Sequence, residues 1–282
     1  MRFHLPTAEI FVPDGQPVEV ALARTTHLAI SAHQDDIEIM AAQPILHCFQ
    51  RDDRWFTGVV VADGRGSPRD ELYKDYTDEQ MRVVRFKEQK KAAVVGEYAA
   101  QVLLDYPSRV LKDGRDVRPV DDLAAIIAAC RPQALFTHNL ADKHDTHVSV
   151  ALRVIAALRR LPEADRPKQV VGCEVWRDLD WLTDDDKVVF DVTLHENLQA
   201  ALLGVFDSQI AGGKRYDLAS LGRRRANATY YATHGTDVTT GLNYGMDLTP
   251  LVNDPALSPQ AYVQSYIQRF ADEVSRRLQT FG

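Results

Sequence analysis

The sequence predicts an α/β fold: a Rossmann-like three-layer sandwich in which helices cover both faces of a mainly parallel central sheet. Short apolar runs of strand length alternate with longer segments of helical spacing from residue 26 to residue 176. Up to residue 176, each connection between successive apolar runs contains a helical segment, as the right-handed crossovers between parallel strands require.

Six apolar runs have the length and composition of buried strands, at residues 26–31, 55–62, 101–106, 133–138, 168–176 and 187–192. Six further segments have helical spacing, at residues 37–50, 81–100, 121–131, 147–161, 195–207 and 259–280. We expect Pro44 to kink the first of these helices. Gly96 lies near the end of the second.

Length and composition indicate one globular domain over residues 1–282, with a core at about 26–176 and a C-terminal cap at about 177–282. The chain has 282 residues, of which 45% are hydrophobic, and this is sufficient for a large core. Three cysteines, Cys48, Cys130 and Cys173, lie far apart in apolar surroundings, so we expect buried thiols and no disulfide framework.

The charge balance argues against a partner that is a polyanion. The net charge is −7 and the isoelectric point is about 5.7, whereas nucleic acid or an anionic lipid surface would attract a concentrated positive face. The N-terminus lacks the pattern of a signal peptide, and no apolar run has the length of a membrane span. We therefore expect a cytoplasmic location.

Two polar clusters directly follow two of the predicted strands. "AHQDDIE" (32–38) follows the strand at 26–31, and "THNLADKHDTH" (137–147) overlaps and follows the strand at 133–138. In the strand order common to Rossmann-like sheets these strands are neighbours, and ligands collect beyond the carboxyl ends of the strands. The two clusters are therefore expected to meet at one edge of the sheet.

The residue types in the clusters are those of a catalytic metal site. His33 and Asp36 are three residues apart, as are His144 and His147, so each pair turns toward one side of a helix start. Imidazole and carboxylate are typical ligands of a catalytic zinc, which keeps one position open for water. His33, Asp36 and His147 are the expected ligands, and Asp35 is left free to act as the general base.

Plainer interpretations stay open for the same residues. Adjacent aspartates before a helix often serve as an N-cap and as first-turn charges, which is an equal alternative for Asp35 and Asp36. His138 lies close enough to the second cluster to orient a ligand or to replace one. Zn²⁺ is the expected metal, although such ligands also accept other divalent ions. Capping alone, however, does not require two His/Asp clusters at neighbouring strand ends.

The motifs resemble those of the PIG-L or LmbE-like zinc-dependent deacetylases, which remove acyl groups from N-acetylglucosamine-type amides. "AHQDDIE" is similar to the family's A-H-P-D-D-E, and "HDTH" (144–147) is similar to its H-x-D-H. "RFKEQKKAAVVG" (85–96) resembles the family's R-x-x-E helix, and "LQAALLGVFDSQI" (198–210) resembles its late helix with Ser-Gln. The resemblance covers about residues 26–235.

The resemblance assigns the functional roles residue by residue. It implies a metal site formed by His33, Asp36 and His147, with Asp35 as the base. It implies that His144 polarises the substrate carbonyl or protonates the leaving amine, and that Arg85 contacts the substrate. Arg65 and Arg69, in the loop after the strand at 55–62, are further candidates for substrate contact. Ion pairing with nearby acids is an equal alternative for these arginines.

Three positions depart from the family pattern. Gln34 replaces the usual proline, which is expected to loosen the turn. Ile37 stands in place of the family's glutamate, and Glu38 follows it, facing elsewhere. Thr146 replaces the aspartate that normally orients the first histidine of the second motif, so the role of His144 is the one most affected.

We therefore expect a zinc-dependent hydrolase that deacylates an N-acyl amino sugar or a related small amide. Asp35 would accept a proton from water, and His144 would help to stabilise the oxyanion. Two other classes stay open: a metal-dependent hydrolase of another bond, such as a phosphoester, and an inactive Rossmann-like binding module. The expected partner is a small N-acylated sugar, with no nucleic acid and no membrane span; a homo-oligomer stays open.

Overall fold

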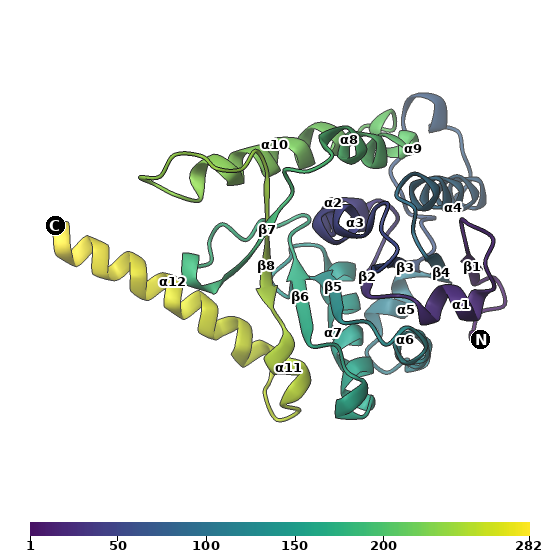
Figure 1. The fold of residues 1–282 in the computed structure, drawn as a ribbon, viewed down its shortest axis with the longest axis horizontal. Coiled ribbons are helices and arrows are strands. Elements are labelled where there is room, and N and C mark those ends of the chain that lie inside the picture. Colours follow the sequence, from purple (N-terminus) through teal and green to yellow (C-terminus); the bar gives the residue numbers. More distant parts are fainter.

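The computed structural model describes residues 1–282 and contains one eight-stranded sheet. Its strands are β1 (Glu9–Phe11), β2 (His27–Ser31), β3 (Phe56–Ala62), β4 (Ala100–Tyr106), β5 (Ala134–His138), β6 (Gln169–Cys173), β7 (Lys187–Asp191) and β8 (Leu242–Asp247). Across the sheet the order is β1-β4-β3-β2-β5-β6-β8-β7 (Figure 1). The strands from β4 to β6 are parallel, and only the outer strands β1, β8 and β7 pair in antiparallel fashion. The predicted α/β fold with a mainly parallel sheet is confirmed.

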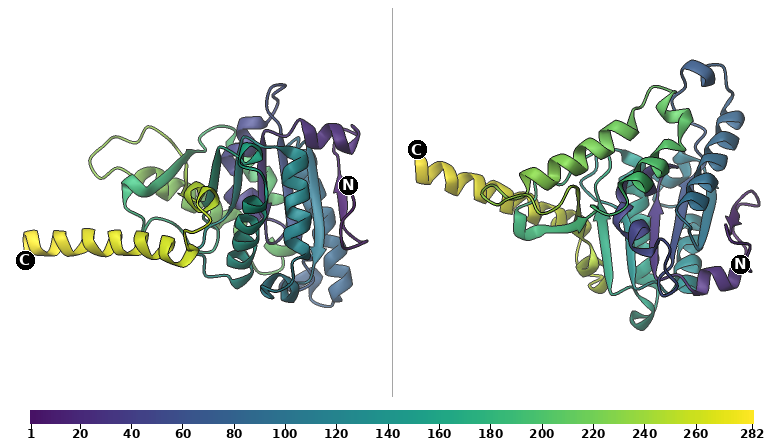
Figure 2. Two further views of the ribbon diagram at one scale, coloured as in Figure 1. Left: turned by 90° about the horizontal axis from the view of Figure 1, so that it is seen from below. Right: turned by 45° about the horizontal axis from the view of Figure 1, so that its top comes forward.

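Helices cover both faces of this sheet (Figure 1). One face carries α1 (Val18–Ala23), α5 (Ser108–Lys112), α6 (Arg118–Cys130), α7 (Asp145–Arg160) and α11 (Thr249–Asn253). The other carries α2 (Asp36–Met40), α3 (Ala42–Cys48), α4 (Asp78–Val95), α8 (Glu196–Gly204), α9 (Asp207–Ile210) and α10 (Tyr216–Tyr230). Three 3-10 turns lie at Glu71–Tyr73, Glu163–Asp165 and Asp184–Asp186. The last helix, α12 (Pro259–Phe281), projects away from the sheet (Figure 2).

Successive residues of the central strands pack into two separate hydrophobic cores, one on each face of the sheet. In β2, Leu28 and Ile30 pack in the core that includes α6 and α7, whereas Ala29 packs in the core that includes α2, α4 and α8. Because side chains alternate across a strand, a strand covered on both faces must be apolar throughout, which explains the continuous apolar runs of the sequence. All three cysteines are buried and unpaired, as predicted.

The segment predicted as one helix over residues 37–50 forms two. Ala41, between α2 and α3, leaves helical geometry (φ −110°, ψ 31°). Pro44 explains the break, because it has no N–H for the carbonyl of Met40 and its ring clashes with that carbonyl. The proline therefore interrupts the helix instead of kinking it.

The helix predicted over residues 81–100 is displaced toward the N-terminus. Thr77 and Gln80 form a capping box that starts α4 at Asp78. The helix ends at Val95, and Glu97 adopts a positive φ of 53° as the chain turns toward β4.

The C-terminal region, expected to form a cap, also extends the sheet. β8 was not predicted; it lies between β6 and β7, so residues 187–191 and 242–247 complete one side of the sheet. The sequence analysis likewise did not identify β1, α1, α5, α10 or α11. No helix of the chain combines the length and the apolar character needed to cross a membrane.

His27, at the start of β2, allows a test of the fold that does not involve the clusters. Burial lowers the pKa of His27 from 6.5 to about 4, and its ring stacks on Phe136. Because the folded pKa is depressed, the stabilising contribution is present above pH 6.5 and is lost as the pH falls through 4. We expect His27→Gln to reduce the fall in unfolding free energy over this pH window by about 1–2 kcal/mol, allowing for partial exposure. Urea titrations at several pH values measure the unfolding free energy of each protein, with His234→Gln, in an exposed loop, as the control. Equal pH dependence of this free energy for the wild type and His27→Gln would contradict the prediction.

Candidate metal and catalytic site

The carboxyl ends of β2 and β5 bring the two polar clusters together. The two strands are direct neighbours, with Leu28 paired to Leu135. His33 follows β2 and Asp36 begins α2, while His147 lies in the first turn of α7, directly after β5. Side chains more than a hundred residues apart in the sequence thus share one point at the sheet edge.

Three donor atoms form a compact triangle at this point. Nδ1 of His33, Oδ2 of Asp36 and Nε2 of His147 each lie 3.2 Å from the other two. Ligands of a tetrahedral zinc at about 2.0–2.1 Å lie about 3.3 Å from one another, so the triangle fits such an ion without rearrangement. Nitrogen and oxygen donors with no thiolate are the set that an open, catalytic zinc site uses.

Asp142, in the loop before α7, orients His147 from behind. Its Oδ2 lies 3.5 Å from Nδ1 of His147, and its Oδ1 accepts a hydrogen bond from the backbone N–H of His144 at 2.9 Å. A carboxylate behind a histidine directs the opposite ring nitrogen toward a metal. Asp142 was not predicted from the sequence; its position two residues before His144, where an aspartate caps a turn, was the available signal.

The charges of the cluster also favour a cation. Burial would raise the pKa of Asp36, but contacts with His147 and His33 hold it well below its usual range. Burial would lower the pKa of His147, but Asp36 and Asp142 overcome this effect and raise it to about 9. The cluster therefore holds a positive charge between its carboxylates, in the place where a metal ion would supply one.

His138 and His144 complete the histidine cluster in different ways. His138 is fully buried, its ring stacks on His147 at 3.8 Å, and its Nε2 accepts the backbone N–H of Ala32 at 2.8 Å. Because that nitrogen is occupied, His138 positions the end of β2 and does not need to bind a metal. His144 borders the cleft with its ring 4.9 Å from that of His33, and burial, with nearby His147, lowers its pKa to about 4.

Asp35 sits in a strained turn beside the triangle. Its φ of 78° is rare for a residue with a side chain, and such strain collects at functional sites when neighbours hold it in place. Arg85, from α4, donates to Oδ2 of Asp35 at 2.7 Å and to the carbonyl of Gln34. Burial raises the pKa of Asp35 to about 7, against the opposing effect of Arg85.

A chain of contacts joins Asp35 to the far wall of the cleft. Arg85 also pairs with Glu88 at 3.2 Å, and Glu88 accepts hydrogen bonds from both the N–H and the Oγ of Ser208, each at 2.7 Å. Arg85, Glu88 and Ser208 are all buried. The R-x-x-E pair of α4 and the Ser-Gln of α9, which were separate motifs in the sequence, are thus one connected unit.

Gln34 does not loosen the turn, contrary to expectation. Its side chain is fully buried and donates to the carbonyl of Ala62 at 3.3 Å. Gly64 makes this possible: it has a positive φ of 73°, and a Cβ there would lie 2.5 Å from Oε1 of Gln34. The turn is therefore fixed to the end of β3 by a hydrogen bond at the position where the family has a proline ring. Glu38 faces away from the triangle, as expected, and accepts from Tyr98 and Gln89.

The arginines predicted to contact substrate are engaged in ion pairs. Arg65 pairs with Asp63 at 3.0 Å and with Glu79 at 2.6 Å, and it does not line the cleft. Arg69 pairs with Asp78 and also stays outside the lining. Arg85 does border the cleft, but its guanidinium is 2% exposed, which suits it to holding Asp35 more than to reaching a ligand.

A polar cleft of about 250 Å³ opens over the triangle. Besides His33, Asp35, Asp36, Arg85 and His144, it is lined by residues from the loops and helices around the sheet edge: Asp63, Gly64, Gly66, Ser67, Pro68, Ser108, Lys112, Thr146, Trp176, Gln209, Lys214 and Tyr216. Trp176 and Tyr216, with ring centroids 5.9 Å apart, form an aromatic corner among these polar groups. Apart from the two clusters and Gln209 of the Ser-Gln motif, the residues from Ser108 to Tyr216 were not predicted from the sequence, because no local pattern marks them.

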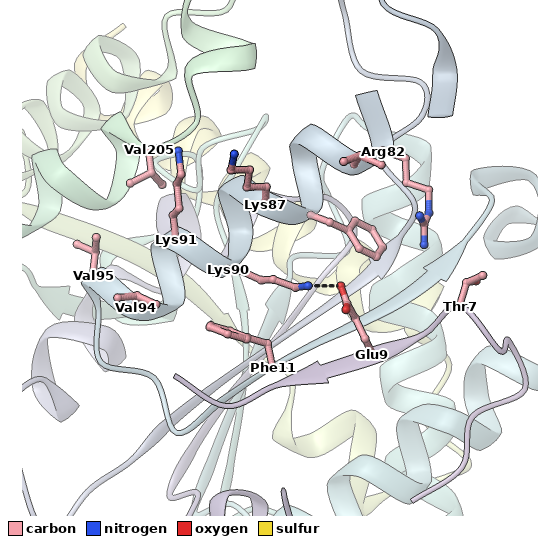
Figure 3. Close-up of a pocket in the computed structure, with 12 residues that line it drawn as sticks. Thr7, Glu9, Phe11, Arg82, Lys87, Lys90, Lys91, Val94, Val95 and Val205 are labelled. Carbon is pink, nitrogen blue, oxygen red and sulfur yellow. Dashed lines mark ion pairs between the residues drawn. The ribbon is translucent and has the colours of Figure 1, made fainter. Parts of the chain in front are cut away.

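A larger groove of about 700 Å³ lies elsewhere, between β1 and α4. Figure 3 shows it, with Lys90 on α4 reaching Glu9 on β1 at 2.7 Å. It shares no lining residue with the cleft over the triangle. The size of this groove is therefore no reason to locate the functional site there. The cluster of titratable groups with shifted pKa values indicates the smaller cleft as the candidate site.

The sequence profile of the PIG-L family, described as GlcNAc-PI de-N-acetylase, matches residues 28–158. This range contains both polar clusters and α4. A search of curated protein sequences finds no match.

Several solved structures share the fold. The conserved protein TT1542 from Thermus thermophilus is 16% identical, with a TM-score of 0.61 over 83% of this chain and 99% of that one. N,N'-diacetylchitobiose deacetylase from Pyrococcus horikoshii is 17% identical, with a TM-score of 0.59 over 78% and 83%. The 4-carboxy-2-hydroxymuconate hydratase GalB from Pseudomonas putida is 16% identical, with a TM-score of 0.57 over 79% and 96%. Since a deacetylase and a hydratase both share it, the fold alone does not define the reaction.

Proposed function

Because residues 28–158 belong to the PIG-L family, we propose that this chain is a metal-dependent N-deacylase acting on a small N-acylated amino sugar. The observation that carries the proposal is the triangle of His33, Asp36 and His147, whose donor atoms lie 3.2 Å apart. Beside it lies the carboxyl of Asp35, a residue with a strained, positive φ. Family membership favours amide hydrolysis among the reactions that such a site supports.

His33, Asp36 and His147 would hold the metal, with Zn²⁺ as the first candidate because the donor set contains imidazole and carboxylate only. A bound divalent ion supplies Lewis acidity, which acidifies water and polarises a carbonyl. Asp142 keeps Nε2 of His147 directed at the site.

Asp35 is the proposed general base. Its raised pKa, about 7, lies in the range where a carboxylate both accepts a proton readily and returns it. Arg85 holds one carboxylate oxygen, which leaves the other to accept the proton of the attacking water. Arg85 is thus proposed as a positioning residue, and the substrate contact predicted for it stays a prediction.

His144 is proposed to act on the acyl side of the substrate. Its lowered pKa keeps the ring neutral at physiological pH, so it can donate a hydrogen bond to a carbonyl oxygen without carrying a charge. Thr146 provides no carboxylate to orient this ring, and Nδ1 of His144 has no hydrogen-bond partner. The proton that reaches the leaving amine is therefore assigned to Asp35.

The lining of the cleft supports a sugar as the amine component. Ser67, Ser108 and Gln209 offer hydroxyl and amide groups, and Trp176 and Tyr216 offer aromatic faces, which together match a hydroxylated ring. The volume of about 250 Å³ is below the roughly 300–1,000 Å³ of typical drug-sized sites, which favours one sugar unit.

The test combines metal analysis with an assay of acyl release. We expect purified protein to contain about one equivalent of divalent metal and to release acetate from N-acetylated amino sugars. A chelator should abolish this activity, and Zn²⁺ should restore it. Release of acetate and of primary amine in equal amounts identifies the bond that is broken.

Parallel substrates distinguish the other classes. A metal-loaded protein that cleaves phosphate monoesters and no amide would contradict the proposal in favour of a phosphoesterase. Hydration of an unsaturated carboxylate without acyl release would contradict it as well. A protein that binds no metal and turns over none of these substrates would identify a binding module.

A further inference from the structure

The C-terminal helix α12 is anchored to the body only by its first half. Tyr262 donates to the carbonyl of Asp247 at 2.6 Å, Tyr266 is buried, and Arg269 pairs with Asp186 at 2.7 Å. No hydrogen bond or ion pair joins residues 270–281 to any part of the chain outside α12 and the following Gly282. Figures 1 and 2 show this half projecting from the body.

The projecting half carries an exposed apolar stripe. With spacings of three, four, four and three residues its members fall on one side of the helix. They are Ile267 (49% exposed), Phe270 (40%), Val274 (41%), Leu278 (69%) and Phe281 (87%). Large apolar side chains in a continuous line on an otherwise solvated helix mark a contact surface.

No other part of the chain covers this stripe. The neighbouring segment Asp184–Asp186 faces the opposite, charged side of α12 across a groove of about 1040 Å³. The helix wall of that groove consists of polar and charged residues and, at its end, Phe281: Arg269, Asp272, Glu273, Arg276, Arg277, Thr280 and Phe281. Of the stripe, only Phe281 borders this groove, and the other four members lie outside it.

We propose that the stripe binds the same stripe of a second copy of this chain, in antiparallel fashion about a two-fold axis at Val274. A self-complementary surface is what such an axis requires. In this arrangement Phe270 faces Leu278 of the second copy and Ile267 faces Phe281 of the second copy. The smallest member, Val274, meets itself on the axis, where the helices come closest.

The charges beside the stripe agree with the antiparallel direction. Glu273 and Arg277 lie on the same flank and already pair within one helix at 2.7 Å. In an antiparallel pair this flank faces the same flank of the second copy, which runs in the opposite direction. Glu273 of each copy then approaches Arg277 of the other, which gives two symmetric ion pairs. A parallel pair would instead bring both globular bodies to the same end of the helices. Because the free half carries both signs of charge, it lacks the basic face that an anionic membrane would select.

The first experiment compares two variants of the full chain that add the same charge. Sedimentation equilibrium over a range of concentrations should show a monomer–dimer equilibrium for the wild type. Val274→Arg should raise the dimer dissociation constant by more than about tenfold, because it buries a charge at the axis. Gln279→Arg, on the opposite side of the helix, should leave it unchanged. Thermal unfolding should match for all three proteins, since residues 270–281 make no hydrogen bond or ion pair outside α12 and Gly282.

The second experiment tests direction by cross-linking. The native cysteines are all buried, so an engineered cysteine on α12 is the accessible thiol. Val274→Cys should form a disulfide-linked dimer under mild oxidation, and Gln279→Cys should not. Ile267→Cys and Phe281→Cys should link to each other when mixed, and neither should link to itself.

Three results would overturn the proposal. The first is a monomeric wild type at the highest concentration measured. The second is a dimer that Val274→Arg leaves intact, which would place the interface elsewhere. The third is self-linking of Ile267→Cys, which would indicate a parallel pair. Binding of a monomer to anionic vesicles through the stripe would assign it to a lipid surface instead.

Discussion

Asp35→Asn is expected to lower kcat for amide hydrolysis by roughly 10²–10⁴-fold, the usual contribution of a general base, while the metal content stays unchanged. The amide keeps the size of the side chain and a hydrogen-bond acceptor for Arg85, but it cannot accept a proton from water. Asp35 is not a member of the triangle of donor atoms, so the substitution leaves all three of these atoms in place. Steady-state kinetics and metal analysis on the same preparation measure both quantities.

Asp63→Asn is the matched control. Asp63 also borders the cleft and pairs with an arginine, Arg65, but it lies outside the triangle. We expect its effect on kcat to be small. Thermal unfolding of both variants detects any loss that comes from breaking a buried ion pair. An Asp35→Asn protein that retains its metal and its full turnover would assign the proton transfer to another group.

His147→Ala is expected to remove the metal. Its Nε2 lies 3.2 Å from both other donor atoms, so its loss leaves two ligands, and the affinity for Zn²⁺ should fall by more than about 100-fold. Added Zn²⁺ should raise the melting temperature of the wild type, because it binds the folded state, and should not raise that of the variant. Metal analysis and thermal scans with and without Zn²⁺ measure this.

Two other histidine variants serve as controls for the loss of metal in His147→Ala. His234→Ala, in an exposed loop, should bind metal as the wild type does. His138→Gln should also retain metal, since Nε2 of His138 accepts from Ala32 and is not needed as a ligand. Retention of stoichiometric metal by His147→Ala would contradict the ligand set. Loss of metal in His138→Gln would instead favour the buried group of Asp36, His138 and His147 as the ligands.

The central strands could be predicted because burial on both faces gives each of them an unbroken apolar run. β8 escaped prediction because Asn243 and Gly245 interrupt its apolar residues, and its partners β6 and β7 are distant in the sequence. A Cβ at Gly245 would lie 2.3 Å from Val171 of β6, so the residue that hides the strand is the one that lets it pack. α10 escaped prediction because its buried residues are the polar Arg224 and Asn227, so it lacks the apolar stripe that marks a core-facing helix.

The convergence of His33, Asp36 and His147 could be anticipated because each follows a strand end, and strand order then dictates proximity. The pairing of Glu88 with Ser208 could not, since nothing local at either residue refers to the other. Gln34 shows a further limit of prediction from sequence. The absence of the family's proline indicated a looser turn, and only the structure shows that the buried Gln34 side chain, packed against Gly64 and bonded to Ala62, restrains the turn instead.

The buried link from Asp35 through Arg85 and Glu88 to Ser208 has a consequence for protein engineering. Gln209, next to Ser208, borders the cleft, so redesigning that wall for a new substrate also disturbs the contacts that hold Asp35, the proposed proton acceptor. Selectivity and turnover in this molecule cannot be tuned one at a time from the α9 side. Libraries that vary Trp176 or Lys112, which stand outside the link, offer the route to altered selectivity at constant rate.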